Sequence, residues 1–187
     1  MAATWRFNDH AEHVKMFFDC IVVPNYMEFY ELGLEGRDRY GDLPKSGWNA
    51  AAAIYHMWEH LKDEWRIKYE SQKPDAFKLL REVTNTYKHF KADRAEKIKE
   101  LHTSRSFDVS ITDVVHFSDG VPTNAKHNDG KIKVSIHLKI ELIDGTKLDM
   151  QDLLDQMMRF YIDILNTELG EQGSLQDRIE LFKAKRA

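Results

Sequence analysis

The chain has 187 residues, of which 42% are hydrophobic and 31% are charged, and its formal net charge is −4. This composition is typical of an ordinary globular protein, and the length is sufficient for one substantial core. The negative balance argues against a protein that coats nucleic acid or a membrane through overall positive charge. It leaves room for a local basic patch.

Cysteine usage and the N-terminal residues bear on the compartment. Cys20 is the only cysteine, so the chain can form neither an internal disulfide nor a cysteine zinc cluster. It lies in an apolar stretch, which predicts a buried and unreactive thiol. A lone cysteine fits a reducing compartment, and the N-terminus lacks an apolar signal core. No apolar run approaches the roughly 20 residues that span a bilayer. We therefore expect a cytoplasmic protein without membrane contact.

The N-terminal segment predicts a helix that is interrupted once. Asn8 or Asp9 can cap its start, and apolar residues then recur at helical spacing. Pro24 predicts a kink or a break, because proline lacks the amide that continues the helical hydrogen bonds. A second helical piece is expected to carry the aromatic residues of segment 26–30.

A loop and three helical segments follow in the middle of the chain. Residues 33–45 contain three glycines and a proline without a steady period, which predicts a loop. Ser46 is the expected cap of a helix over 47–69, and Pro74 suits the first turn of a helix over 74–90. The charged segment 91–105 predicts a short exposed helix. The expected buried stripe of the 47–69 helix is Ile54, Trp58, Leu61 and Trp65.

The pattern changes to a period of two from Ser106 onward. Segment 132–142 alternates apolar and polar residues throughout, which predicts a half-buried strand of an antiparallel sheet. Asp144-Gly145 is a strong hairpin signal and predicts a further strand over 146–148. Asp149 is then expected to cap a long helix that ends at Gly170. The remaining residues predict a last short helix.

Together these elements predict an α+β protein, namely an antiparallel helical bundle with a small antiparallel β-meander and a C-terminal helix that returns to the bundle. The expected division is a helical part over 1–103, a meander over 104–149 and C-terminal helices over 150–187. One compact domain is expected to contain all three parts.

The 74–90 segment carries the first candidate site. Its apolar residues recur at alternating spacings of four and three, so they form one buried helix face. Arg81, Asn85 and His89 then fall together on the opposite face. A cation, an amide and an imidazole in one row are candidates for a site, and they are equally the residues of a solvated helix face. The apolar residues are Ala76, Leu80, Val83, Tyr87 and Phe90.

Segment 8–101 resembles the HEPN superfamily, the higher-eukaryote and prokaryote nucleotide-binding domains. These are helical bundles, many of which dimerise and cut RNA without a metal. Their motif is an arginine, usually followed by a polar residue such as asparagine, with a histidine four to six residues after the arginine. Segment 84–89 supplies the asparagine and the histidine at this spacing. Threonine stands at position 84, where the arginine belongs, and Arg81 lies one turn earlier.

The resemblance implies a homodimer and a catalytic site formed by His89, Asn85 and Arg81. His89 would act as general acid and base on a ribose hydroxyl, a role that suits the near-neutral pKa of histidine. Arg81 or Lys88 would stabilise phosphate charge. No cofactor is implied.

The charged segment extends this candidate toward RNA binding. Between Arg81 and Arg105 there are seven Lys or Arg residues against four acids, a local excess of three positive charges in an acidic protein. Such a cluster can contact phosphates. Lys88, Lys91 and Arg94 are therefore the expected substrate-binding residues. The alternative interpretation is a solvated helix with internal ion pairs.

His56, His60 and Asp63 form a second candidate row. Their spacings of four and three place them on one side of the predicted 47–69 helix. Two histidines one turn apart can bind a metal ion, and a carboxylate adds an oxygen ligand. The zinc-protease pattern HExxH is absent, and surface histidines or a second packing face are the preferred explanation of the row, so no bound metal is expected.

Three functions thus remain open from the sequence. The first is an RNA-binding or RNA-cleaving HEPN-like protein, or a relative that has lost cutting activity. The second is a non-catalytic module that binds a protein partner, as an accessory protein of a phage or a defence system does. The third is a metal-binding helical bundle.

Overall fold

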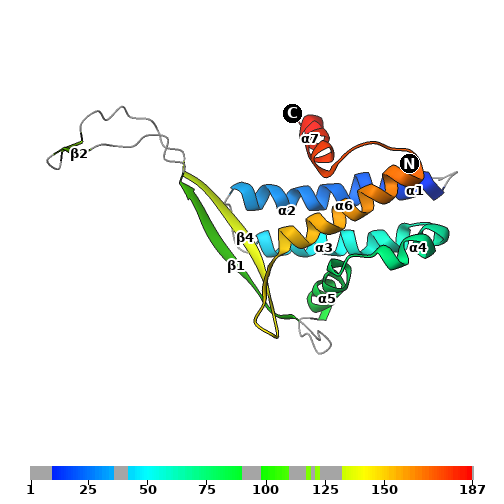
Figure 1. Ribbon diagram of the computed structural model, residues 1–187, viewed down its shortest axis with the longest axis horizontal. Coiled ribbons are helices and arrows are strands. Elements are labelled where there is room, and N and C mark those ends of the chain that lie inside the picture. The colour runs from blue at the N-terminus through cyan, green and yellow to red at the C-terminus, as the bar shows by residue number, and fades with distance from the viewer. Residues whose placement is uncertain are drawn as a thin grey trace, which may run out of the picture.

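The computed structural model describes residues 10–35, 42–89, 98–109, 117–118, 121–122 and 132–186. Within these residues a bundle of helices packs against a small antiparallel sheet (Figure 1), so the predicted α+β fold class is confirmed. The helices are α1 (His10–Phe17), α2 (Val23–Glu35), α3 (Asp42–His60), α4 (Asp63–Tyr69), α5 (Ala76–His89), α6 (Met150–Leu169) and α7 (Leu175–Arg186). The strands are β1 (Ile98–Val109), β2 (Phe117–Ser118), β3 (Val121–Pro122), β4 (Ile132–Leu142) and β5 (Lys147–Asp149).

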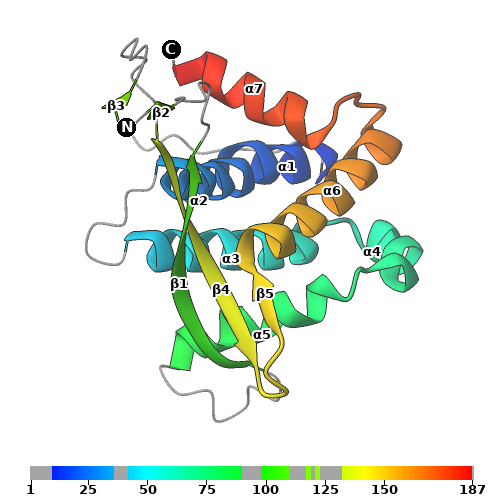
Figure 2. The same cartoon turned by 60° about the vertical axis from the view of Figure 1, so that its left-hand side comes forward.

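The main sheet has the order β1-β4-β5, and all its pairs are antiparallel. Figure 2 shows its strands side by side, with α2 and α3 behind them. The predicted hairpin is confirmed between β4 and β5. Gly145 has a positive φ of 86°, and the Asp144 carboxylate accepts a hydrogen bond of 2.8 Å from the backbone amide of Thr146. The turn residues therefore fix the register of the last two strands.

The helix predicted over 91–105 is wrong from residue 98 onward, because Ile98–Val109 form β1. Residues 91–97 lie outside the described part of the chain. β1 pairs with β4 along its whole length, with Leu101 opposite Ile140 and Val109 opposite Ile132. The hydrogen bonds of a long partner strand thus override the local preference of a charged segment for helix.

Pro24 does not break the N-terminal helix, contrary to the prediction. A π-helical turn over Phe18–Val22 joins α1 to α2 without interruption, and the Val23 amide donates to the Phe18 carbonyl. The side-chain amide of Asn25 donates to the Ile21 carbonyl at 2.7 Å. The wider turn and this side chain compensate for the missing amide of Pro24, so the chain remains helical through this position.

The π-helical turn also corrects the prediction for Cys20. Phe18 and Val22 are buried on its inner side, whereas Cys20 and Ile21 are exposed. The apolar residues around Cys20 in the sequence suggested burial, but only part of this turn faces the core. The predicted buried thiol is therefore wrong.

The predicted helix over 47–69 has different bounds. α3 begins at Asp42, and Pro44 lies in its first turn, where a missing amide costs little. Ser46 is buried inside α3 and donates to the Leu43 carbonyl at 3.1 Å, so it is not the cap. An extended residue, Lys62 with ψ 146°, separates α3 from α4. Since α2 also runs to Glu35, the predicted 33–45 loop is shorter than expected.

The core lies where α3 meets α2 and the sheet. A Cβ added to Gly47 would meet the Leu138 side chain at 2.8 Å and the Phe29 ring at 3.1 Å, so glycine allows this close approach. The predicted stripe of α3 and α4 is confirmed as buried, and so are Leu80 and Val83 of α5. None of the described helices combines the length and the apolarity that a membrane crossing needs.

The last two helices follow their predicted signals. The Asp149 carboxylate caps α6 by accepting from the Gln151 amide at 2.9 Å, and Gly170 ends α6 with a φ of 65°. α6 then packs against α3 and α5, so the predicted return of a C-terminal helix to the bundle is confirmed. α7 follows after a short connection and contacts α2 and α6.

Candidate functional site

The polar row of α5 lies on its solvent face, as its period predicts. Arg81 and Asn85 are exposed. The side chains of Lys88 and His89 lie outside the described part of the chain, as do residues 90–97 with Lys91 and Arg94. The structure thus places two members of the predicted RNA site, Arg81 and Asn85, on the exposed face of α5.

Thr84, which stands at the arginine position of the HEPN-like motif, is part of the core. Its side chain is only 2% exposed, and its hydroxyl donates to the Leu80 carbonyl at 2.9 Å. A threonine hydroxyl that donates to a backbone carbonyl of the preceding turn has its hydrogen-bonding requirement met within the helix. Position 84 therefore has a structural role and does not belong to the exposed row of Arg81 and Asn85.

The metal row predicted from His56, His60 and Asp63 does not converge. His56 Nδ1 lies 2.9 Å from the Glu59 carboxylate, and Asp63 pairs with Arg66. Because α3 ends at His60 and α4 begins at Asp63, the helical spacing on which the row depended is interrupted. Across the residues that the structure describes, no group of three or more His, Cys, Asp or Glu side chains is arranged to hold a metal ion.

His60 instead meets two histidines from the first helix. Its Nδ1 atom lies 3.0 Å from Nε2 of His13, and Nε2 of His10 lies 3.1 Å from the His60 carbonyl oxygen. The ring of Phe17 stacks on His60, with centroids 3.6 Å apart and an interplanar angle of 19°. We call His10, His13 and His60 the histidine cluster. It joins the start of α1 to the end of α3.

Electrostatics in the histidine cluster favour the neutral form of His60. Burial lowers the pKa of His60, and the adjacent His13 lowers it further. This cluster was not predicted from the sequence. The signal was the spacing of three between His10 and His13, which places both on one face of a helix. Their meeting with His60 depends on how α1 packs against α3, which the spacing does not give.

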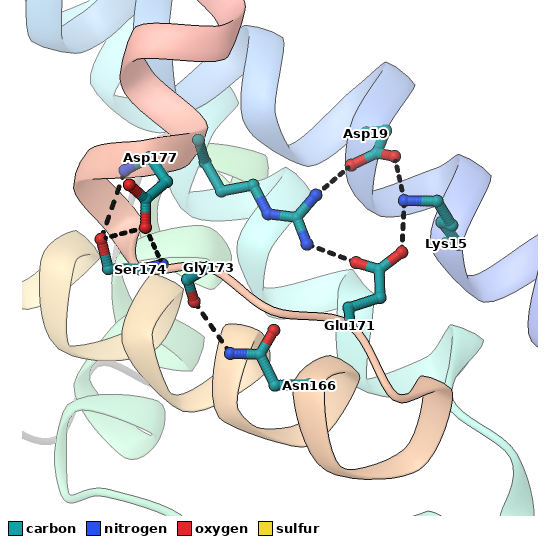
Figure 3. A network of polar contacts seen from close by, with 8 residues as sticks. Lys15, Asp19, Asn166, Glu171, Gly173, Ser174 and Asp177 are labelled. Carbon is teal, nitrogen blue, oxygen red and sulfur yellow. Dashed lines mark hydrogen bonds and ion pairs between the residues drawn. The ribbon is translucent and has the colours of Figure 1, made fainter.

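A second polar cluster, the charge ring, lies further along the N-terminal helix, at the end of α1 and in the π-helical turn. Figure 3 shows Lys15 between the carboxylates of Asp19 and Glu171, at 2.8 and 2.6 Å. Arg178 of α7 closes the ring, since its guanidinium pairs with Glu171 and lies 3.6 Å from Asp19. Its side chain is 10% exposed and lies over the ring of Phe18. Two cations and two carboxylates thus alternate around the contact between the N-terminal helix and α7.

The charge ring holds Glu171 in its charged form. Burial acts to raise the pKa of Glu171, but hydrogen bonds from Lys15 and Arg178 outweigh it, and the pKa is lowered. Next to the ring, Ser174 and Asp177 cap α7, with 2.6 Å between the Ser174 amide and the carboxylate (Figure 3). These contacts explain how a short connection positions α7.

Comparison with known proteins assigns no family to the chain. No family model, no curated protein and no solved structure matches it. The resemblance to HEPN proteins therefore rests on the α5 residues and the helical layout alone.

A cavity of about 540 Å³ lies between α2, α6 and α7. Two of its lining residues are joined, since Tyr26 donates to the Asp155 carboxylate at 2.8 Å. Gln151, outside the lining, donates to both, at 3.0 Å to Tyr26 and 2.6 Å to Asp155. Burial, followed by the Asp155 charge, raises the pKa of the Tyr26 hydroxyl. These polar groups satisfy one another, so they orient the side chains of α2 and α6 rather than activate a nucleophile.

Proposed function

We propose that the protein binds RNA in the cytoplasm without cleaving it, as a HEPN-like protein that lacks the catalytic arginine. The observation that supports this is the division of α5 into an exposed polar face with Arg81 and Asn85 and a buried face with Thr84. The exposed face has groups that bind phosphate and base edges. Thr84, which stands where the motif has its arginine, lies on the buried face.

Three residues support binding by the exposed face. Lys78, Arg81 and Asn85 follow one another at spacings of three and four, so they lie along one stripe. The side chain of Lys78 is 72% exposed and is 3.8 Å from Asp75. Arg81 has no ion-pair partner among the described residues. A cation without an ion-pair partner in this described part of the chain is available to a phosphate group.

The absence of cleavage follows from Thr84. Stabilising the charge that develops on phosphorus requires a cation at the reacting group. A side chain at position 84 points into the core, where its hydroxyl bonds Leu80, so it cannot supply that charge. Arg81 lies at a spacing of eight from His89, outside the spacing of the family that the motif resembles.

Fluorescence anisotropy with a labelled single-stranded RNA tests the binding. Wild type is compared with Arg81→Ala and with the double variant Arg81→Ala, Asn85→Ala. Arg159→Ala is the matched control, because Arg159 is an exposed arginine on α6. We expect Arg81→Ala to weaken binding and to reduce the salt slope by about one, as loss of one phosphate contact does. The control should bind like wild type. Equal binding by all variants would contradict the proposal.

A cleavage assay separates binding from catalysis. A mixed RNA pool is incubated with wild type in EDTA, beside a His89→Ala variant. We expect intact RNA in both. Metal-independent cutting that disappears in the His89 variant would show that the protein is a nuclease and that the non-cleaving proposal is wrong.

A second candidate function, protein binding through β1, is favoured by the sheet order. β1 lies at the edge of the main sheet, and its outer side has no neighbouring strand among the described residues. An open edge of twelve residues is a template for another strand. Its two cations and two carboxylates balance each other, which suits pairing with β1 of a second copy. They are Lys99, Arg105, Glu100 and Asp108.

Light scattering coupled to size exclusion tests this homodimer. Thr103→Pro and Ser104→Pro are both made, because neighbouring residues direct their amides to opposite sides of a strand. One of the two positions directs its amide outward, and proline there removes a donor from the open edge only. We expect a wild-type dimer and a monomeric variant with unchanged circular dichroism. A wild-type monomer at all concentrations would contradict the homodimer.

A further inference from the structure

Within the histidine cluster, His13 and His60 bring two imidazole nitrogens from two helices to nearly the spacing of two ligands on one metal ion. Nε2 of His13 and Nδ1 of His60 are 3.0 Å apart. Two imidazole nitrogens bound to one tetrahedral zinc ion at about 2.05 Å are about 3.3 Å apart. The observed distance between the two nitrogens is therefore within a few tenths of an ångström of the distance between two ligands of one ion.

We infer that His13 and His60 bind a divalent transition-metal ion of the zinc type, with water in the remaining coordination positions. The ion replaces the proton that the two nitrogens share. Each neutral imidazole carries one proton, and whichever ring holds it between the two nitrogens moves it to its other nitrogen. Both facing nitrogens then offer a lone pair, and the neutral pair releases no proton.

Three features of the site favour binding of such a metal ion. Imidazole is a preferred ligand of Zn²⁺, Cu²⁺ and Ni²⁺. Stacking of Phe17 on His60 fixes the plane of that ring, and a fixed ligand lowers the ordering cost of binding. His13 and His60 are only partly buried, and the exposed His10 lies beside them, so an ion can enter from solvent.

The inference differs from the metal row predicted from the sequence. That row joined His60 to His56 on its own helix, whereas the structure joins it to His13 on another helix. His56 has a separate partner in Glu59 at 2.9 Å. Substitution of His13 therefore tests the site, and substitution of His56 is the matched control.

Calorimetric titration of the tag-free chain with Zn²⁺ tests the site. Wild type, His13→Gln and His56→Gln are compared after removal of metals with EDTA and dialysis. We expect one zinc per wild-type chain, binding weakened by about tenfold or more in His13→Gln, and unchanged binding in His56→Gln. Loss of a ligand should cost at least as much as the loss of an outer partner. Binding that His13→Gln leaves intact, or that His56→Gln abolishes, would overturn the inference.

Two further measurements do not depend on variant folding. Zinc X-ray absorption of the loaded wild-type chain should show two imidazole nitrogens, and a first shell without imidazole would overturn the inference. A zinc concentration one hundred times the Kd should raise the wild-type Tm by about 5–10 °C. An unchanged Tm at that concentration would show that zinc does not bind the folded state selectively, which also overturns it.

Discussion

The N-terminal helix is held by two polar clusters that differ in the charges that face each other. In the charge ring, Lys15 and Arg178 alternate with Asp19 and Glu171, so each charge lies beside an opposite one. In the histidine cluster, two side chains of the same kind meet nitrogen to nitrogen. The ring is complete as it stands, whereas the pair of imidazoles shares one proton between two lone pairs.

This difference separates a structural role from a binding role. Opposite charges with several hydrogen bonds stabilise a contact without any ligand. Two facing imidazoles contribute one modest hydrogen bond and can bind a cation in place of the proton. We therefore expect the ring to account for stability and the histidine cluster for metal binding.

Arg178→Ala should have the largest effect on stability. Its side chain is 10% exposed and pairs with two carboxylates, and its removal leaves Asp19 and Glu171 with one cation between them. Removing one partner of a buried ionic contact costs about 3–5 kcal/mol. Urea unfolding at pH 7, followed by circular dichroism, measures the loss.

Arg66→Ala is the matched control for this variant. Arg66 also pairs with an aspartate, Asp63, but its side chain is 38% exposed and that of Asp63 is 84% exposed. An exposed pair contributes about 0–1 kcal/mol. Equal losses of unfolding free energy in the two variants would show that burial of the charge ring does not increase its contribution to stability.

Acid should weaken the charge ring through Glu171, whose pKa lies below its ordinary value of 4.5. A carboxyl with a lowered pKa stabilises the folded state above the pKa of the unfolded chain, and this contribution is lost as the pH falls through the folded pKa. Glu171→Gln should therefore cost about 1 kcal/mol at pH 7. Its stability should fall less than that of wild type between pH 5 and pH 3.

Urea unfolding at pH 7, 5, 4 and 3 compares the two proteins. The curves of stability against pH should converge toward low pH, because the wild-type carboxyl becomes neutral like the amide. Parallel curves would mean that Glu171 is not held in its charged form by Lys15 and Arg178.

The sequence predicted those parts of the fold that depend on local chemistry. As expected, α6 begins after Asp149 and ends at Gly170, and Asp144-Gly145 forms the hairpin turn. Caps and tight turns are determined by a few adjacent residues. The solvent face of α5 followed from its period. The β1 strand could not be predicted over 98–105, since only its pairing with β4 makes it a strand.

The candidate site was predictable only within single helices. Arg81 and Asn85 share a face because they belong to one helix, and that prediction is confirmed by their exposure. His56, His60 and Asp63 do not share one helix face, because Lys62 adopts an extended conformation between α3 and α4. The meeting of His13 with His60 spans 47 residues of sequence, so no local pattern contains it.

His13→Gln should have the smallest effect on stability in the absence of metal. The His13–His60 hydrogen bond is only partly buried, and a glutamine amide can form a similar bond. We expect urea unfolding in EDTA to differ from wild type by about 0.5 kcal/mol or less, as for other partly exposed substitutions. A loss of about 2 kcal/mol or more would make the histidine cluster a structural contact like the charge ring. A small loss together with lost zinc binding would assign the two clusters different roles, because only a binding site loses its ligand while the fold stays intact.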